Sequence, residues 1–274
     1  MSPDSGKLKR IGNTDVIALL TDFGTADYYV GSVKGVILSI NPNAKIVDIS
    51  HDVPPQDIEA GAFTLFAAHA AFPAKTIFAA VVDPGVGSAR RPLVLKTDDY
   101  FFVGPDNGLF SYIYESKAHT TFQITNEKYF RHPVSPTFHG RDVFGPVAAY
   151  LSKGEDPAVF GPTIDDEVRL PVFRPNRVKD HVWQGRIIHI DHFGNCVTNI
   201  RRETLNERQE PNAKIQIKGK TITSFRKFFT EADGKQKLFA LWGSAGFLEI
   251  ASVKKSAAKI LKAKRGDSVK LELK

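Results

Sequence analysis

The chain has 274 residues, 42% of them hydrophobic and 24% charged, a balance typical of a globular protein with one or two domains that excludes collagen-like and disordered classes. Its single cysteine excludes an internal disulfide, and no apolar run approaches the roughly 18 to 20 residues of a membrane helix. Most of the net charge of +7 lies in residues 251–274, which hold eight Lys or Arg, two acids and no aromatic residue, so we expect a solvated surface and no nucleic-acid partner. These features favour a cytoplasmic protein without membrane association.

The first half of the chain alternates short β-rich apolar runs with helical patterns, which is typical of βαβ units. We predict strands at residues 16–20, 46–49, 77–82, 93–96 and 101–103. We predict helices at residues 30–40, 58–72 and 141–151. This order indicates a Rossmann-like α/β domain with a mostly parallel sheet over residues 14–172, preceded by an N-terminal extension at 1–13.

From Pro171 the sequence becomes extended and rich in proline, so we predict a linker at residues 173–180. Short β-rich runs follow at residues 182–190, 214–218, 238–242, 247–250 and 268–273. Apolar residues recur at helical spacing between 253 and 261 and indicate one helix. The pattern predicts a smaller antiparallel β-barrel domain over residues 181–274.

Polar residues follow three of the predicted strands, where α/β sheets bind their ligands. Asp22 follows the first strand and fits either a ribose diol or a helix cap. Asp83 begins a glycine-rich turn that leads to Arg90, and Asn107 lies in an Asn-Gly turn; both patterns also fit simple turn chemistry. No glycine-rich fingerprint follows a strand, which disfavours a standard dinucleotide site or P-loop.

Histidines supply two further candidates. His139 precedes a predicted helix and fits a proton carrier, a group that orients water, or a structural histidine. His189, Asp191 and His192 form a weak metal-binding pattern, because no further ligand is defined. Glycines beside Ser244 allow backbone amides to approach a ligand closely.

Six motifs, in the same order along nearly the whole chain, together resemble the S-adenosyl-L-methionine hydroxide adenosyltransferase family, which is related to the fluorinase and chlorinase enzymes. The motifs are residues 21–24, 41–44, 83–87, 105–108, 138–142 and 191–195. The resemblance implies hydrolysis of S-adenosyl-L-methionine to adenosine and L-methionine, by attack of water or hydroxide at C5′ of the ribose. It also implies no metal or other cofactor, and a homotrimer with its ligand site between subunits.

The resemblance places the family's water-handling groups at Asp83, Arg90 and His139. This set is chemically reasonable, because Arg90 supplies a permanent positive charge that favours hydroxide, while the other two orient water and handle its proton. The resemblance further places Asp22 at the ribose hydroxyls. It places the remaining substrate contacts, to the methionine and adenosine parts, at Asp27, Asn107, Asp191, Phe193, Asn195 and Ser244.

Three alternatives remain open. A chloride-using halogenase is disfavoured because fluorinase has a Tyr-Pro-Ala-Thr-Gly type of segment where this chain has Asp83, whose carboxylate repels halide. A non-catalytic sensor of S-adenosylmethionine or adenosine does not need three water-handling groups. A metal-dependent hydrolase would use His189, Asp191 and His192. Ala245 stands where fluorinase has an arginine, which leaves the contact to the methionine carboxylate open.

Overall fold

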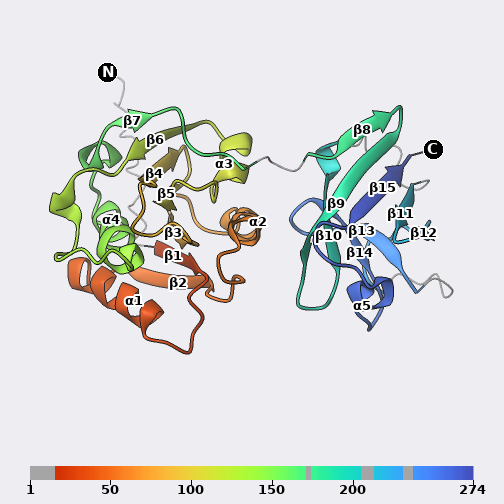
Figure 1. Ribbon diagram of the computed structural model, residues 1–274, viewed down its shortest axis with the longest axis horizontal. Helices are drawn as coiled ribbons and strands as arrows, with labels where there is room; N and C mark the ends of the chain where they lie inside the picture. Colours follow the sequence, from red (N-terminus) through yellow and green to blue (C-terminus); the bar gives the residue numbers. More distant parts are fainter. Residues whose placement is uncertain (1–15, 171–173, 205–212, 231–236, 274) are drawn as a thin grey trace, which may run out of the picture. The chain divides into compact units, whose positions relative to one another are not determined.

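The computed structural model describes residues 16–170, 174–204, 213–230 and 237–273 and divides into two compact units, Met1–Leu170 and Pro171–Lys274 (Figure 1). The extension predicted at residues 1–13 lies outside the described residues. The segment predicted as a linker, residues 173–180, includes a short strand, β8 (Asn176–Lys179), which pairs with the strand that follows it.

The first unit is built on a seven-stranded sheet in the order β2-β1-β3-β5-β4-β6-β7. Four strands run parallel to one another: β1 (Val16–Thr21), β2 (Lys45–Ser50), β3 (Ile77–Val81) and β5 (Phe101–Pro105). The other three extend the sheet in antiparallel fashion: β4 (Pro92–Thr97), β6 (His119–Gln123) and β7 (Thr163–Ile164). The predicted α/β class and the parallel strands are confirmed, whereas β6 and β7 were not predicted.

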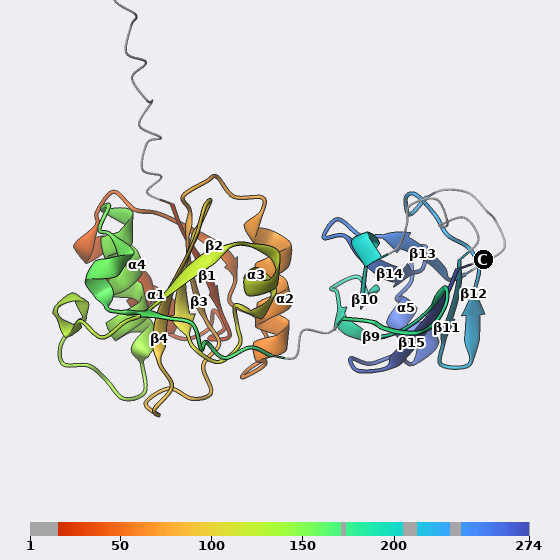
Figure 2. The ribbon, with the colours of Figure 1, turned by 90° about the horizontal axis from the view of Figure 1, so that it is seen from above.

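Helices cover both faces of this sheet (Figure 2). On one face lie α1 (Tyr29–Ile40) and α4 (Gly145–Ser152), and on the other α2 (Ile58–His69) and α3 (Ser111–Ser116). Single turns of 3-10 helix lie at Glu127–Tyr129 and Pro157–Phe160. Strands β1 and β3 are almost continuously buried, as expected for parallel strands covered on both sides.

The helix predicted at residues 141–151 begins differently from the prediction. Residues Gly140–Phe144 form a π-helical turn, and α4 continues from it. Pro146 has no backbone N–H, so it cannot donate to the carbonyl of Asp142 as a regular helix requires. That carbonyl instead accepts a hydrogen bond from the backbone N–H of Arg131 (2.8 Å), which ties the preceding loop to the turn.

The second unit is an antiparallel, nearly closed, barrel-like sheet, which confirms the predicted class. Its strands lie in the order β12-β11-β15-β9-β10-β14-β13. Its strands besides β8 are β9 (Val182–Ile190), β10 (Cys196–Arg201), β11 (Lys214–Ile217), β12 (Lys220–Ile222), β13 (Phe239–Trp242), β14 (Phe247–Ala251) and β15 (Ser268–Glu272). The described helical segments are a 3-10 turn at Arg202–Thr204 and α5 (Ala257–Leu261).

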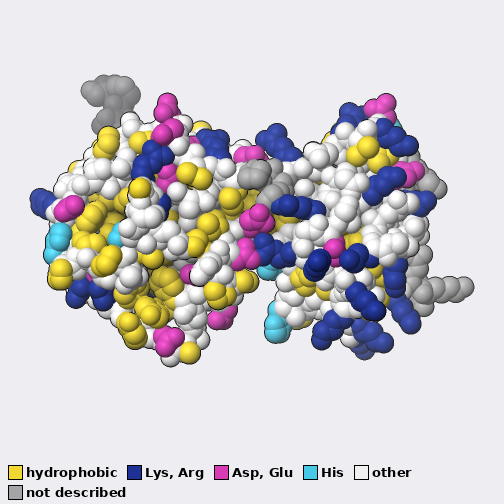
Figure 3. Space-filling view, in the orientation of Figure 1, with side chains coloured by type: hydrophobic (Ala, Val, Ile, Leu, Met, Phe, Trp, Pro, Cys, Tyr) yellow, Lys and Arg dark blue, Asp and Glu magenta, His cyan; other side chains and the backbone are white. Residues whose placement is uncertain are grey.

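Helix α5 is shorter than the apolar pattern suggested, because Ser256 caps its first turn by accepting from the N–H of Lys259 (3.1 Å). Ala257, Ala258 and Leu261 face the core, while Lys259 is exposed. Lys and Arg side chains gather over this unit (Figure 3), consistent with the solvated basic surface predicted for residues 251–274. No helix among the described residues is long and apolar enough to cross a membrane.

Candidate active site

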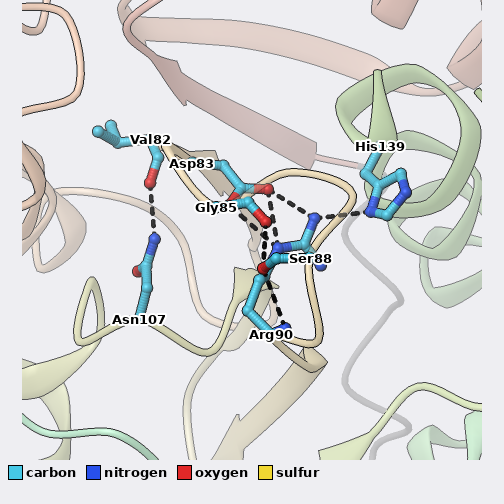
Figure 4. Close-up of polar contacts among 7 residues, drawn as sticks. All are labelled: Val82, Asp83, Gly85, Ser88, Arg90, Asn107 and His139. Atoms are coloured by element: carbon cyan, nitrogen blue, oxygen red, sulfur yellow. Dashed lines mark hydrogen bonds and ion pairs between the residues drawn. The ribbon is translucent and has the colours of Figure 1, made fainter. Parts of the chain in front are cut away.

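The loop that leaves β3 carries a buried ion pair. The Nε of Arg90 donates to both carboxylate oxygens of Asp83, at 3.0 Å and 2.9 Å, and its Nη2 donates to Oδ2 at 2.6 Å (Figure 4). Only 4% of the Asp83 side chain and 9% of the Arg90 side chain is exposed. Such charge-assisted contacts fix both groups in position. The guanidinium also lies 5.1 Å from the ring centre of Phe144, and its Nη1 is buried without a hydrogen-bond partner.

The glycine turn predicted after Asp83 positions this pair. Gly87 has φ of 77°, a left-handed conformation that glycine adopts without strain. A Cβ at Gly87 would overlap the backbone carbonyl of Pro136, so the turn packs directly against the loop that leads to His139. A larger residue at position 87 would force these two loops apart.

His139 joins the pair from that second loop. Its Nδ1 lies 2.7 Å from Nη2 of Arg90 (Figure 4). Because a guanidinium can only donate, Nδ1 must accept, so the neutral imidazole carries its proton on Nε2. Burial and the positive charge of Arg90 both lower the pKa of His139 below its ordinary value, which favours this neutral form.

Asp142 anchors the loop that carries His139. Its fully buried carboxylate accepts from Nε of Arg141 (2.7 Å), Nη1 of Arg131 (3.2 Å) and the N–H of Ser135 (2.9 Å). Burial alone raises the pKa of this carboxyl, but these hydrogen bonds hold it below its ordinary value. The pairing of Asp142 with Arg141 therefore fixes the turn after His139.

A cavity of about 210 Å³ opens beside this cluster within the first unit. Asp83 and His139 line it together with an aromatic wall of Phe23, Tyr29 and Phe138. Ring centres in this wall lie 5.1 to 6.0 Å apart. The cavity therefore combines two ionisable side chains with a surface suited to a flat or apolar ligand.

Asp22, Asp27 and Asn107 occupy different environments at the same end of the sheet. Asp22 accepts from the backbone N–H of Gln56 (2.8 Å), and burial raises the pKa of its carboxyl. Asp27 is exposed on the loop before α1. Asn107 donates to the carbonyl of Val82 (2.8 Å) and accepts from the N–H of Leu109 (3.2 Å), so its amide fixes the strand end that carries Asp83.

A network that sequence reasoning missed supports the loop of Asp22. Oγ1 of Thr21 lies 2.8 Å from Nδ1 of His51, and Nε2 of His51 lies 3.0 Å from Oδ1 of Asp48. Asp48 in turn accepts from Nζ of Lys34 (2.6 Å). Thr21 and His51 are 30 positions apart in the chain, and the parallel pairing of β1 with β2 brings them together, while Lys34 joins from α1.

The second unit contains a larger cavity of about 910 Å³, between the β9–β10 loop and the β13–β14 hairpin. The four residues predicted in this half of the chain all line it: Asp191, Phe193, Asn195 and Ser244. Asp191 accepts from the N–H (2.7 Å) and the Nδ2 (2.8 Å) of Asn195, which closes the loop, and Phe193 is 75% exposed. Sequence reasoning missed Glu249, which lines the same cavity.

The alternative metal set is not assembled in the described parts of the chain. There, no three His, Cys, Asp or Glu side chains lie close enough together to hold a metal ion. Asp191 is engaged instead with Asn195, and His192 is exposed.

The fold and the two cavities define a two-domain protein: an α/β domain with a charged site at its strand ends, and an antiparallel β domain with its own ligand-sized cavity. The sequence matches the family models of the SAM hydroxide adenosyltransferase N-terminal domain over residues 17–161 and C-terminal domain over residues 185–270. The chain belongs to this family, as the six motifs predicted.

Individual relatives agree with this membership. A protein of Methanocaldococcus jannaschii named (R)-S-adenosyl-L-methionine hydrolase is 36% identical, over 94% of this chain and 95% of its own. A fluorinase of Actinoplanes is 31% identical, over 70% of this chain and 74% of its own. The crystal structure of an uncharacterized conserved protein from Thermotoga maritima superposes with a TM-score of 0.85 at 35% identity, covering 93% of this chain and 99% of its own.

Proposed function

We propose that this protein hydrolyses S-adenosyl-L-methionine to adenosine and L-methionine by attack of water at C5′ of the ribose. The observation that carries the proposal is the buried cluster of Asp83, Arg90 and His139, of which Asp83 and His139 face one cavity. The hydrolase relative supports the substrate class. The leaving group is a neutral thioether, so the site needs to activate water but does not need an acid for the leaving group.

The geometry supports a division of labour among the three groups. His139 accepts from Arg90 at Nδ1, so it orients the attacking water by donating from Nε2 rather than by removing a proton. Asp83 accepts three hydrogen bonds from Arg90, which leaves one lone pair, on Oδ1, and this carboxylate takes the proton. Arg90 stabilises the negative charge that develops on the oxygen. The C5′–O bond forms as the C5′–S bond breaks, and sulfur keeps the electron pair of the broken bond.

The same geometry argues against a halide nucleophile. The carboxylate of Asp83 lies at the cavity wall, where it attracts a proton of water and repels chloride. We therefore expect no 5′-chloro-5′-deoxyadenosine when the enzyme turns over in high chloride. Formation of that compound at a rate comparable to adenosine would favour the halogenase alternative.

We also propose which stereoisomer is cleaved. The hydrolase relative is named for (R)-S-adenosyl-L-methionine. Separated sulfur epimers, incubated with the enzyme at equal concentration, test this preference, and we expect the R epimer to react faster.

We propose that Asp22 binds the ribose hydroxyls and that the methionine and adenosine parts are bound by Asp27, Asn107, Asp191, Phe193, Asn195 and Ser244. We propose a cytoplasmic homotrimer with the ligand site between subunits, acting without a metal or other cofactor. The cavity of the second unit supports the binding roles of the four residues that line it, Asp191, Phe193, Asn195 and Ser244.

Product analysis tests the function. Purified enzyme is incubated with S-adenosyl-L-methionine in chloride-free buffer containing a chelator, and the products are separated by chromatography. We expect adenosine and methionine in equal amounts. Binding without products would favour the sensor, and activity that is lost with the chelator and regained with a metal would favour the metal-dependent hydrolase.

A further inference from the structure

His51 is a buried histidine to which neither the motifs nor the proposed mechanism gives a role. It lies directly after β2, and 4% of its side chain is exposed. Its Nε2 lies 3.0 Å from Oδ1 of Asp48, and its Nδ1 lies 2.8 Å from Oγ1 of Thr21, the last residue of β1. Because His51 lines neither of the two cavities described above, any role in the reaction must act through its neighbours.

The chemistry of these neighbours determines where the protons lie. Asp48 also accepts from Nζ of Lys34 (2.6 Å), and an ionised carboxylate can only accept, so the ring of His51 carries a proton on Nε2. Nδ1 of the neutral ring then accepts from the hydroxyl of Thr21. Oγ1 of Thr21 in turn accepts from the backbone N–H of Phe23 (3.3 Å). His51 thus orients the hydroxyl so that a lone pair faces Phe23.

The same histidine and the chain after it hold the rest of this loop. The backbone carbonyl of His51 accepts from the N–H of Gly24 (2.8 Å), whose φ of 68° is a left-handed conformation that suits glycine. The N–H of Gln56 donates to Oδ2 of Asp22 (2.8 Å). Three consecutive residues, from Asp22 to Gly24, are therefore fixed by hydrogen bonds that depend on the segment that His51 begins.

This loop carries groups that belong to the candidate site. Asp22 is the proposed partner of the ribose hydroxyls, and the ring of Phe23 forms part of the aromatic wall of the 210 Å³ cavity. A Cβ at Gly140 would lie only 3.1 Å from that ring, so the loop packs closely against the residue that follows His139. A shift of the loop would therefore move the ribose relative to His139, and such misplacement is costly for a reaction that depends on alignment.

We propose that His51 is a positioning residue: through Thr21 it fixes the loop of Asp22 and Phe23 in the position that binds the nucleoside part of the substrate. The assignment rests on the proposed function for the identity of that ligand. The hydrogen bond accepted at Nδ1 is the decisive contact. Asparagine should replace His51, because its Oδ1 is bonded to Cγ as Nδ1 is, whereas leucine offers no acceptor.

Calorimetry with adenosine tests the assignment on the full-length protein without any turnover. The two variants are His51→Leu, which removes the acceptor, and His51→Asn, which restores one. The matched control is His69→Leu, on α2: His69 is equally buried and its Nδ1 lies 2.7 Å from the carbonyl of Phe66, but it lines neither cavity. Urea denaturation measures the free energy of unfolding of each variant, so that lost binding can be compared with lost stability.

We expect His51→Leu to raise the Kd of adenosine about tenfold, the size of one lost hydrogen bond, and His51→Asn to raise it less than about threefold. His69→Leu should lose stability and keep the wild-type Kd. Thr21→Val, a smaller change, should weaken binding as His51→Leu does, and the double variant should weaken it no further, because both changes remove the same contact.

An unchanged Kd in His51→Leu and Thr21→Val, or equal weakening by His51→Asn or His69→Leu, would overturn the assignment alone. If the wild type had no affinity for adenosine, the proposed function would fail and the assignment with it.

Discussion

The hydrogen bond from Arg90 to Nδ1 of His139 determines what this histidine can do. A guanidinium stays protonated, so the bond persists only while His139 is neutral. Burial and the positive charge of Arg90 lower the pKa of His139 below its ordinary value of about 6.5. His139 is therefore protonated, and its contact with Arg90 broken, only at lower pH. We expect kcat to remain constant as the pH falls to about 6.5 and to decline at lower pH. A decline centred above pH 7 would contradict this.

Asp83 is the proposed proton acceptor, so its charge should matter for turnover more than for binding. We expect Asp83→Asn to lower kcat by about 10²–10⁴-fold, the usual contribution of a general base. The Kd of S-adenosyl-L-homocysteine should change by less than about threefold, because this thioether demands no activated water. Single-turnover kinetics and calorimetry measure the two quantities. Wild-type turnover in Asp83→Asn would show that the proton goes elsewhere.

The π-helical turn at Gly140–Phe144 and the buried carboxylate of Asp142 hold His139 in place. Asp142 is fully buried and paired with two arginines that remain partly exposed. We expect Asp142→Asn to lower the free energy of unfolding by about 3 kcal/mol, the low end for a broken buried ion pair, because the arginines can regain water. Urea denaturation measures this loss, with Asp98→Asn as an exposed control. A loss no larger than the control's would show that the anchor is dispensable.

The sequence predicted elements whose signal is local and missed those that depend on distant partners. Continuous apolar runs predicted β1 and β3 because both of their faces are buried. β6 has four polar residues among its five and pairs with β4 only through the tertiary fold, so no apolar pattern marked it as a strand. The π-turn was missed because its cause, the missing N–H of Pro146, changes the hydrogen bonding without interrupting the helical periodicity.

In the candidate site, too, the sequence predicted residues that lie in local motifs and missed those whose role depends on the fold. Asp83 and Arg90 were predicted from a motif that follows a strand, and His139 from a motif that precedes a helix. The resemblance to the family grouped the three residues. Asp83 and Arg90 are joined by a short turn, but His139 is 49 positions from Arg90, and only the fold brings them into contact. Glu249 was missed because a glutamate at an alternate position of a strand usually faces solvent, and only the cavity shows that it does not.

The proposed assembly of three identical chains determines the mass of the whole molecule in solution. The homotrimer should have about three times the chain mass of 30.3 kDa in solution. Light scattering coupled to size-exclusion chromatography measures this mass directly, at several loading concentrations. A monomer at every concentration, with full activity, would contradict a site that depends on neighbouring subunits.

If water attacks C5′ of the substrate, its oxygen must become part of adenosine. Turnover of S-adenosyl-L-methionine in water enriched in oxygen-18, followed by mass spectrometry of both products, locates the new bond. We expect one labelled oxygen, at the 5′-hydroxyl of adenosine, and unlabelled methionine. Label in methionine, or adenosine without label, would contradict attack at C5′ and with it the proposed roles of Asp83, Arg90 and His139.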